Sequence, residues 1–173
     1  MKSFIFLILL LASFHSFAEN SKALTKNQLR LKIEKLYEKW TKDFQLEEIS
    51  PKELQSLLQQ KAPNVIVVDA RSPEEVRVSK IPHAITKEEI LKAPHTYKNK
   101  LIVTYCTIGY RSGQFATELK EKYHLKVKNL KGSLLGWVLE NGPLVTPEGK
   151  PTKKVHVYSR KWKLVPPDYI PVW

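Results

Sequence analysis

The chain has 173 residues, and its 29 Lys and Arg against 17 Asp and Glu give a formal net charge of +12. This length suits one domain with a hydrophobic core and some additions. A single cysteine excludes an internal disulfide and a cysteine-based structural zinc site. The lysines are spread along the chain without a nucleic-acid-binding motif, so we expect a solvated basic surface and no nucleic-acid partner.

The N-terminus has the organisation of a signal peptide. Lys2 precedes an apolar run from Phe4 to about Phe14, and Ser16 and Ala18 are the small residues that signal peptidase accepts. We therefore expect residues 1–18 to be cleaved and the mature protein to be periplasmic or secreted, without stable membrane insertion. A retained anchor is the alternative, but the run is shorter than the roughly 20 residues that cross a bilayer.

Residues 19–45 are predicted to form an N-terminal amphipathic helical extension. Apolar residues recur at near-helical spacing among lysines and glutamates, and Thr25 is a candidate N-cap. We expect the helix to pack on the main domain, with a partner-binding helix as the alternative. Its candidate apolar residues are Leu29, Leu31, Ile33, Leu36, Tyr37 and Trp40.

Residues 46–145 alternate between helical and strand patterns. Ser50 and Pro51 predict a helix start, since serine caps N-termini and proline favours the first helical position. The β-branched run 65–68 before Asp69 is typical of a strand buried on both faces. This alternation predicts an α/β fold with a mostly parallel sheet covered by helices on both faces. The further elements expected are helices at 73–75, 87–92, 112–123 and 133–140 and strands at 101–105 and 125–130.

Residues 146–173 are rich in prolines and large apolar side chains. Such an aromatic segment is atypical of unpacked chain. We expect an extended tail that packs on the domain, in preference to a ligand site. Its large apolar residues include Val155, Val157, Tyr158, Trp162, Tyr169 and Trp173.

Cys106 lies between the expected strand 101–105 and the next helix. The first N–H groups of a helix lack backbone partners, and with the helix dipole they favour an anion such as a thiolate. Arg111 adds a fixed positive charge, Gly109 lets the loop curl, and Ser112 can cap the helix. A buried inert cysteine is the alternative.

Two motifs resemble those of the rhodanese family of sulfurtransferases. Cys106 to Ser112 reads C-x-x-G-x-R-S, and Asp69 to Glu75 reads D-A-R-S-P-E-E. Residues 132–142, GSLLGWVLENG, resemble the closing helix of that family. The resemblance covers roughly residues 46–144 and implies a three-layer rhodanese-like fold with a mostly parallel sheet of about five strands.

The resemblance also implies roles for these residues. Cys106 is implied to take a sulfane sulfur from a donor such as thiosulfate, carry it as a persulfide and pass it to an acceptor such as cyanide or a thiol. Asp69 and Arg71 are implied to brace the loop. No cofactor or metal is implied. The implied substrate-binding residues are Thr107, Ile108, Gly109, Tyr110, Arg111, which also binds the anionic donor, and Ser112.

The chain departs from the family pattern in the sequence of the loop at residues 79–84, and its cysteine loop carries little charge. Where the family commonly has G-H-I-P-G-A, residues 79–84 read SKIPHA, so we expect either a different turn or a positive φ without glycine. The cysteine loop has one charge, Arg111, with Ile108 and Tyr110 as an apolar rim. A protein or organic persulfide is therefore an alternative donor to a small anion such as thiosulfate, and a protein thiol is a further candidate acceptor.

Two other functions are weighed against sulfur transfer. Cysteine phosphatases place five residues between cysteine and arginine, whereas four separate Cys106 from Arg111, which suits a sulfur atom better than a phosphate. A non-catalytic protein-interaction or anion-sensing module is the other alternative. Glu74 and Glu75 are interpreted as helix-start charges. The resemblance places His83 nearest the site, and metal-like spacing is absent among His83, His95, His124 and His156.

Overall fold

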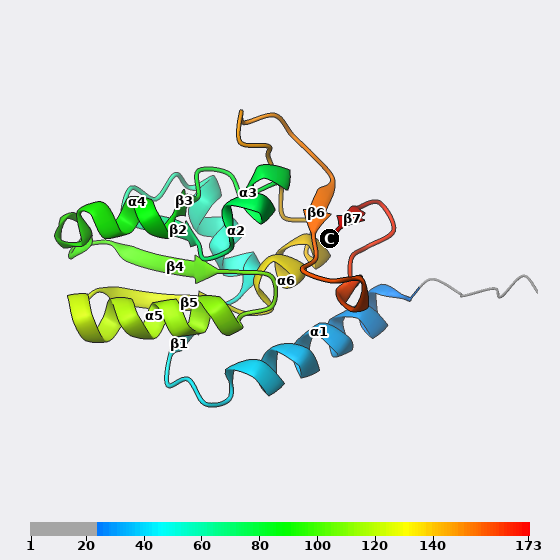
Figure 1. The fold of residues 1–173 in the computed structure, drawn as a ribbon, viewed down its shortest axis with the longest axis horizontal. Coiled ribbons are helices and arrows are strands. Elements are labelled where there is room, and N and C mark those ends of the chain that lie inside the picture. The colour runs from blue at the N-terminus through cyan, green and yellow to red at the C-terminus, as the bar shows by residue number, and fades with distance from the viewer. Residues whose placement is uncertain (1–23) are drawn as a thin grey trace, which may run out of the picture.

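The structure, a computed structural model, describes residues 24–173. Its centre is a five-stranded sheet in which every neighbouring pair is parallel, in the order β1-β5-β4-β2-β3 (Figure 1). The predicted parallel α/β fold is therefore confirmed. The strands are β1 (Glu47–Ile49), β2 (Val65–Asp69), β3 (Ile85–Thr86), β4 (Leu101–Tyr105) and β5 (Lys126–Leu130).

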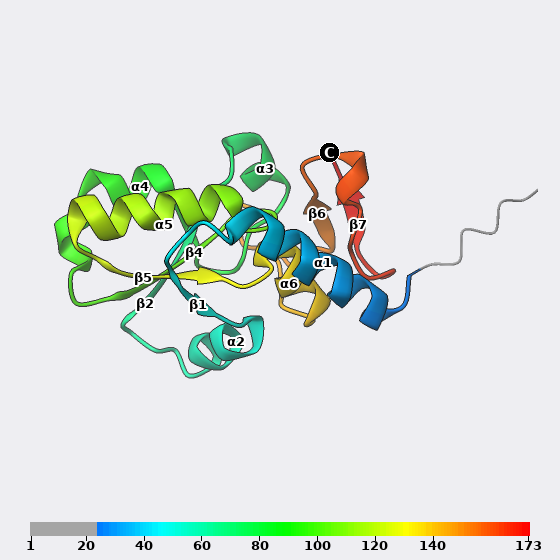
Figure 2. The ribbon, with the colours of Figure 1, turned by 90° about the horizontal axis from the view of Figure 1, so that it is seen from below.

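Helices cover both faces of the sheet, which gives the three layers expected from the sequence. One core cluster joins the sheet to α4 and α5, and the other joins it to α1, α2 and α6. Figure 2 shows α4 and α5 on the side of the strands opposite to α2. The helices are α1 (Lys26–Thr41), α2 (Pro51–Gln59), α3 (Pro73–Val78), α4 (Lys87–Lys92), α5 (Tyr110–Tyr123) and α6 (Ser133–Leu139), with a 3₁₀ turn η1 (Pro94–Tyr97).

Strand β4 lies in the middle of the sheet and leads to the cysteine. It pairs with β2 on one side and β5 on the other, with Val103 opposite Val67 and Lys128. Val103 belongs to the α1/α2/α6 core cluster and Ile102 to the α4/α5 cluster, as expected for a strand buried on both faces. Ligands in parallel α/β sheets bind beyond the carboxyl ends of strands, which is where Cys106 lies.

Two local expectations differ from the structure. Strands β1 and β3 have three and two residues, too short to stand out as apolar runs in the sequence. Helix α5 begins at Tyr110 and not at 112, because Gly109 occupies the N-cap position with a φ of 125°. Ser112 therefore lies inside the first turn of the helix, where it is buried.

The N-terminal helix is confirmed and packs on the domain through one stripe. The Thr25 side chain accepts a hydrogen bond from the Gln28 N–H, as predicted for an N-cap. The buried residues recur every four positions, from Leu29 through Ile33 and Tyr37 to Thr41. Leu31 departs from the expectation, because it points away from this stripe and is 66% exposed.

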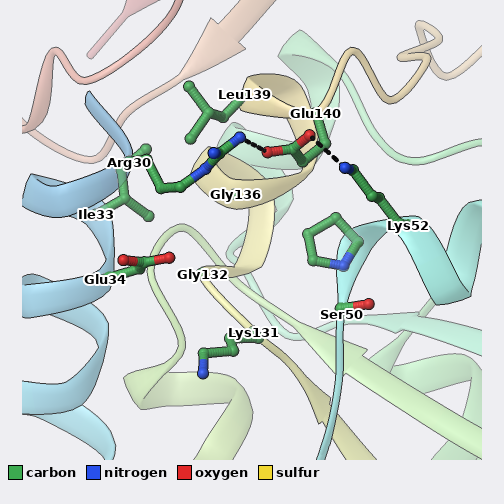
Figure 3. Close-up of a pocket in the computed structure, with 11 residues that line it drawn as sticks. Arg30, Ile33, Glu34, Ser50, Lys52, Lys131, Gly132, Gly136, Leu139 and Glu140 are labelled. Atoms are coloured by element: carbon green, nitrogen blue, oxygen red, sulfur yellow. Dashed lines mark hydrogen bonds and ion pairs between the residues drawn. The ribbon is translucent and has the colours of Figure 1, made fainter. Parts of the chain in front are cut away.

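A cavity of about 300 Å³ marks the junction of α1 with α2 and α6 (Figure 3). Glu140 lies there between Arg30 and Lys52, and the Arg30 guanidinium approaches its carboxylate to 2.6 Å. The carboxylate is therefore paired with cations from two other elements. We interpret this cavity as the junction that holds α1 against the domain.

The C-terminal segment contains a small sheet that the sequence does not predict. Strands β6 (Lys154–His156) and β7 (Ile170–Val172) pair in parallel, with the 3₁₀ turn η2 (Arg160–Trp162) between them. Val155 and Val157 are fully buried in the same core cluster as α1 and α6. Figures 1 and 2 show β6, β7 and α1 gathered at the end of the sheet toward which β4 points.

Within residues 24–173, we find no helix with the length and apolar character needed to span a membrane. The expected signal peptide and its cleavage point lie outside the described residues.

Candidate functional site

Hydrogen bonds from the start of α6 hold the backbone of the Cys106 loop in place. Cys106 is 2% exposed and directly follows β4. Its N–H donates to Ser133 Oγ at 2.9 Å, and its carbonyl accepts from the Leu134 N–H at 3.1 Å. The carbonyl of Thr107 accepts from the Leu135 N–H at 3.2 Å. The first free N–H groups of α6 thus fix the loop backbone.

The sulfur atom lies in a nest at the N-terminus of α5. The Gly109 N–H donates to Cys106 Sγ at 3.1 Å. Helix α5 is 14 residues long and begins at Tyr110, so its positive dipole end is directed at the loop. An amide hydrogen bond and a helix N-terminus both favour negative charge on sulfur. The arrangement suits a thiolate or the terminal sulfur of a persulfide.

Glycine is required at position 109 by both conformation and space. Its φ of 125° is rarely adopted by residues with a Cβ, and a Cβ there would lie 2.6 Å from Cδ2 of Tyr37. Tyr37 belongs to α1, so the N-terminal helix packs directly on the cysteine loop.

A buried polar cluster fixes the back of the loop. Asn129 Nδ2 donates to the Gly109 carbonyl at 3.1 Å and to Tyr37 Oη at 3.3 Å. Ser112 Oγ lies 2.7 Å from Asn129 Oδ1, and Thr104 Oγ1 donates to the Ser112 carbonyl at 3.2 Å. Because these groups satisfy one another, β4, β5, α1 and α5 are tied to the loop conformation.

Arg111 is paired with a carboxylate that the sequence led us to place at a helix start. Its Nη1 and Nη2 donate to Glu75 Oε2 and Oε1 at 2.5 and 2.8 Å, and Thr107 Oγ1 donates to Oε1 at 3.1 Å. Glu75 is 3% exposed, whereas Glu74 stays at the surface and pairs with Arg77. The positive charge of Arg111 is thus balanced within the protein.

The pKa of Glu75 reflects this pairing. Burial by itself raises the pKa of the carboxyl, but hydrogen bonds from Arg111 and the Ser72 N–H and the charges of Arg111 and Arg71 outweigh it. The result is a pKa lowered to about 2. Glu75 is therefore ionised at neutral pH and keeps the Arg111 guanidinium in place.

Asp69 and Arg71 form a second, fully buried ion pair beside the end of β4. Arg71 Nε and Nη2 donate to the two carboxylate oxygens at 2.9 and 2.6 Å, and Nη2 also donates to the Ser79 carbonyl at 2.6 Å. The Tyr105 hydroxyl donates to Asp69 and accepts from the Ile81 N–H. The pair therefore links β2, the 79–81 segment and the strand that leads to the cysteine.

His156 lies nearer these charges than the histidine expected from the sequence. His83 is exposed at a turn with a φ of 62°, so the 79–84 loop keeps a positive φ without glycine. His156 Nδ1 lies 3.7 Å from Glu75 Oε1. Burial and the charges of Arg71 and Arg111 lower the pKa of His156 despite the nearby Glu75.

Cys106 lines a cavity of about 310 Å³. Arg111 contributes to its wall, while Ile108 is 1% exposed and Tyr110 is 40% exposed. The other lining residues come from α1 and the C-terminal segment, and they are Trp40, Tyr158 and Trp162.

Of the predicted loop residues 106–112, Gly109 contacts the sulfur of Cys106, and Ile108, Tyr110 and Arg111 line the cavity with Cys106. The side chains of Thr107 and Ser112 bond instead to Glu75 and Asn129. Asp69 and Arg71 lie beside the end of the strand that leads to Cys106. Sequence reasoning missed several groups that hold or line the loop. The sequence offered one signal for these groups: Asn129 is a polar residue at a buried position of strand β5, where an apolar residue is usual. The missed residues are Tyr37, Trp40, Glu75, Asn129, Ser133, Tyr158 and Trp162.

Comparisons with known proteins identify the family. Residues 50–140 match the family model described as the rhodanese-like domain. A sulfurtransferase of Allochromatium vinosum is 33% identical over 89 residues, which are 50% of this chain and 83% of that protein. The tRNA uridine(34) hydroxylase of Aster yellows witches'-broom phytoplasma is 31% identical over 98 residues, but the match covers only 31% of that enzyme.

A solved structure shares the fold. The thiosulfate sulfurtransferase of Pseudomonas aeruginosa superposes with a TM-score of 0.54 at 20% identity, covering 68% of this chain and 23% of that one. The family model spans more than half of the chain, and its residues include the cysteine loop and the Asp69–Arg71 and Glu75–Arg111 ion pairs. The chain therefore belongs to the rhodanese-like domain family.

Proposed function

We propose that the protein is a sulfurtransferase that carries a sulfane sulfur as a persulfide on Cys106. The Cys106 thiolate attacks the outer sulfur of a donor such as thiosulfate, so that an Sγ–S bond forms while the donor S–S bond breaks and its electron pair leaves on sulfite. An acceptor such as cyanide or a thiolate then attacks the outer sulfur and releases the Cys106 thiolate. Sulfur moves between the partners and no external oxidant is consumed.

One observation carries the proposal: the Gly109 N–H donates to Cys106 Sγ at the N-terminus of α5. Both the attacking thiolate and the persulfide place negative charge on sulfur, which this nest stabilises. In the proposal, the loop from Thr107 to Ser112 surrounds the outer sulfur and Arg111 helps to bind an anionic donor. Asp69 and Arg71 support the site by fixing the end of β4 and the 79–81 segment.

The domain boundaries follow the same proposal. The rhodanese-like domain extends over residues 46–145, preceded by the helical extension 19–45 and followed by the tail 146–173. We propose export by a signal peptide cleaved after Ala18, which rests on the sequence pattern alone. N-terminal sequencing of the mature protein tests this, because retention of Lys2 would contradict cleavage.

A transfer assay tests the proposed reaction. Purified protein is mixed with thiosulfate and cyanide, and thiocyanate is measured over time. We expect turnover by the wild type and only background with Cys106→Ser, which removes the nucleophile while conserving size. Folding of the variant is checked by circular dichroism. A Cys106→Ser protein that turns over like the wild type overturns the proposal.

The same two proteins separate the alternatives. A cysteine phosphatase would hydrolyse an aryl phosphate in a reaction abolished by Cys106→Ser, and we expect no such hydrolysis. A non-catalytic module would keep its biological activity in the Cys106→Ser form. We expect that activity to be lost with the thiol.

A further inference from the structure

Part of the wall of the cavity over Cys106 comes from outside the matched family region. The family model covers residues 50–140. Trp40 reaches the cavity from α1, and Tyr158 and Trp162 reach it from the C-terminal segment. Three aromatic side chains from two separate additions thus converge above one sulfur atom.

The aromatic walls are held in defined positions. The rings of Trp40 and Tyr110 meet edge to face with centroids 5.6 Å apart, and those of Tyr158 and Trp162 lie 5.3 Å apart. The backbone of Tyr158 has a φ of 65°, and its N–H donates to His156 Nδ1 at 3.2 Å. A bulky residue kept in this conformation indicates that the surrounding structure determines where its ring lies.

The cavity offers little net charge to a ligand. Apart from the Cys106 thiolate of the proposed reaction, Arg111 is the only charged side chain among the lining residues that the structure describes. Its guanidinium is already bonded twice to Glu75, and it lies 5.4 Å from the centroid of the Tyr158 ring. A dianion that enters this cavity loses its hydration, and the one cation it meets, Arg111, is already neutralised by Glu75. Entry of a dianion is therefore unfavourable. An apolar group gains free energy when the same walls cover it.

We propose that the cavity selects organic sulfur compounds in which an apolar, preferably aromatic, group carries the transferable sulfur with at most one negative charge. This inference rests on the sulfur transfer proposed above and names its substrate class. The volume of about 310 Å³ is at the lower end of small-molecule pockets, and it accommodates a single ring next to the reacting sulfur. Trp40, Tyr158 and Trp162 are the specificity-determining residues.

Benzenethiosulfonate is a probe of this class. The Cys106 thiolate attacks its terminal sulfur, the Sγ–S bond forms, and the bond between that sulfur and the sulfonyl sulfur breaks. The electron pair of the broken bond leaves on benzenesulfinate, which carries one negative charge, and the transferred sulfur keeps its own negative charge as the terminal atom of the persulfide. Thiosulfate undergoes the same displacement but enters as a dianion without a ring.

The experiment compares kcat/KM for the two donors with one acceptor, cyanide, in the full chain. We expect benzenethiosulfonate to be preferred by at least about tenfold, the discrimination that an added apolar group gives in a fitted pocket. Trp40→Ala and Tyr158→Asn remove a wall, and asparagine tolerates the positive φ at position 158. We expect each to reduce the preference about fivefold or more. Trp173→Ala, a similarly exposed residue of the tail that does not line the cavity, should leave the preference unchanged.

A binding measurement separates this inference from the proposed reaction. Titration calorimetry of the wild type with benzenesulfinate and with sulfite should show the aromatic anion binding more tightly, and Trp40→Ala should reduce this difference. Equal kcat/KM for the two donors, or a preference unaffected by both wall variants, overturns the inference while sulfur transfer stands. Binding of benzenesulfinate without turnover of either donor overturns the proposed function and leaves the cavity selectivity intact.

Discussion

At the residue scale, the conformation of the cysteine loop depends on one glycine and one buried carboxylate. Gly109 meets Tyr37 and has a backbone conformation that side chains disfavour. Glu75 holds Arg111 and also accepts a hydrogen bond from Thr107. Gly109 positions the N–H that donates to Cys106 Sγ, and Glu75 positions the guanidinium of Arg111. A single substitution at each residue therefore tests its role.

Gly109→Ala is expected to destabilise the protein by about 2–4 kcal/mol and to reduce sulfur transfer strongly, because the methyl group collides with the Tyr37 ring. The matched control is Gly149→Ala, which also has a positive φ but has open space around it, so only about 1–2 kcal/mol of backbone strain is expected. Urea unfolding measures both. Equal effects of the two substitutions would show that the Tyr37 contact does not matter.

Glu75 should make the stability depend on acid pH. Its folded pKa of about 2 lies below the ordinary value of 4.5, so its contribution to the free energy of unfolding is complete above pH 4.5 and is lost as the pH falls toward 2. We expect the wild type to lose up to about 2 kcal/mol of stability over this range through this group. The loss is no larger because Arg111 is partly exposed, so that solvent screens the ion pair.

The comparison with Glu75→Gln, by urea unfolding at several pH values, measures this loss. The variant should be less stable at pH 6, and its difference from the wild type should shrink toward pH 2. Glu74→Gln at the exposed neighbouring position should follow the wild type. A stability difference between wild type and Glu75→Gln that stays constant with pH contradicts the assigned ion pair.

At the element scale, α1 positions the loop and one wall of the cavity. Ile33 is 2% exposed in the stripe that packs on the domain, whereas Leu31 on the same helix is 66% exposed. Ile33→Ala should therefore cost about 2–4 kcal/mol by leaving a cavity, and Leu31→Ala should change stability by less than about 0.5 kcal/mol. Thermal unfolding measures the contrast. Similar losses in both variants would show that the docked stripe is wrong.

The elements differ in how far the sequence predicts them. The β-branched runs of β2 and β4 and the capped starts of α1 and α2 carry strong local patterns, and the structure confirms them. Strands β1 and β3 are set by pairing with a neighbour and have little local signal. Likewise, the cysteine motif identifies the loop, but the partners of Arg111 and Gly109 come from distant segments and follow only from tertiary packing.

At the scale of the whole molecule, the N-terminal helix and the tail complete the core of the family domain. Val155 and Val157 of the tail are buried in one cluster with Ile33 of α1 and Val103 of β4. The sequence predicts that the tail packs, but its strands β6 and β7 pair across a long irregular segment that local patterns do not specify. The cavity at Cys106 is therefore lined by three separate parts of the chain, which are α1, the cysteine loop with the start of α5, and the tail.

This shared core predicts one cooperative unfolding unit. The Val157 N–H donates to the Val172 carbonyl, and we expect its hydrogen exchange to be slowed nearly as much as that of the Val103 amide in β4. Native-state hydrogen exchange followed by NMR measures both. Exchange at Val157 that is faster by several orders of magnitude would mean that the tail opens independently and that the cavity wall is not fixed.

The central claim, that Cys106 carries the sulfur, is tested most directly by intact-protein and peptide mass spectrometry after a single loading with donor. We expect the protein to gain the mass of one sulfur atom, located on the peptide containing Cys106, and to lose it when cyanide or a thiol is added, with an equal amount of sulfur appearing in the product. Cys106→Ser should gain nothing. Sulfur transfer by the wild type without any sulfur bound to Cys106 would contradict the account.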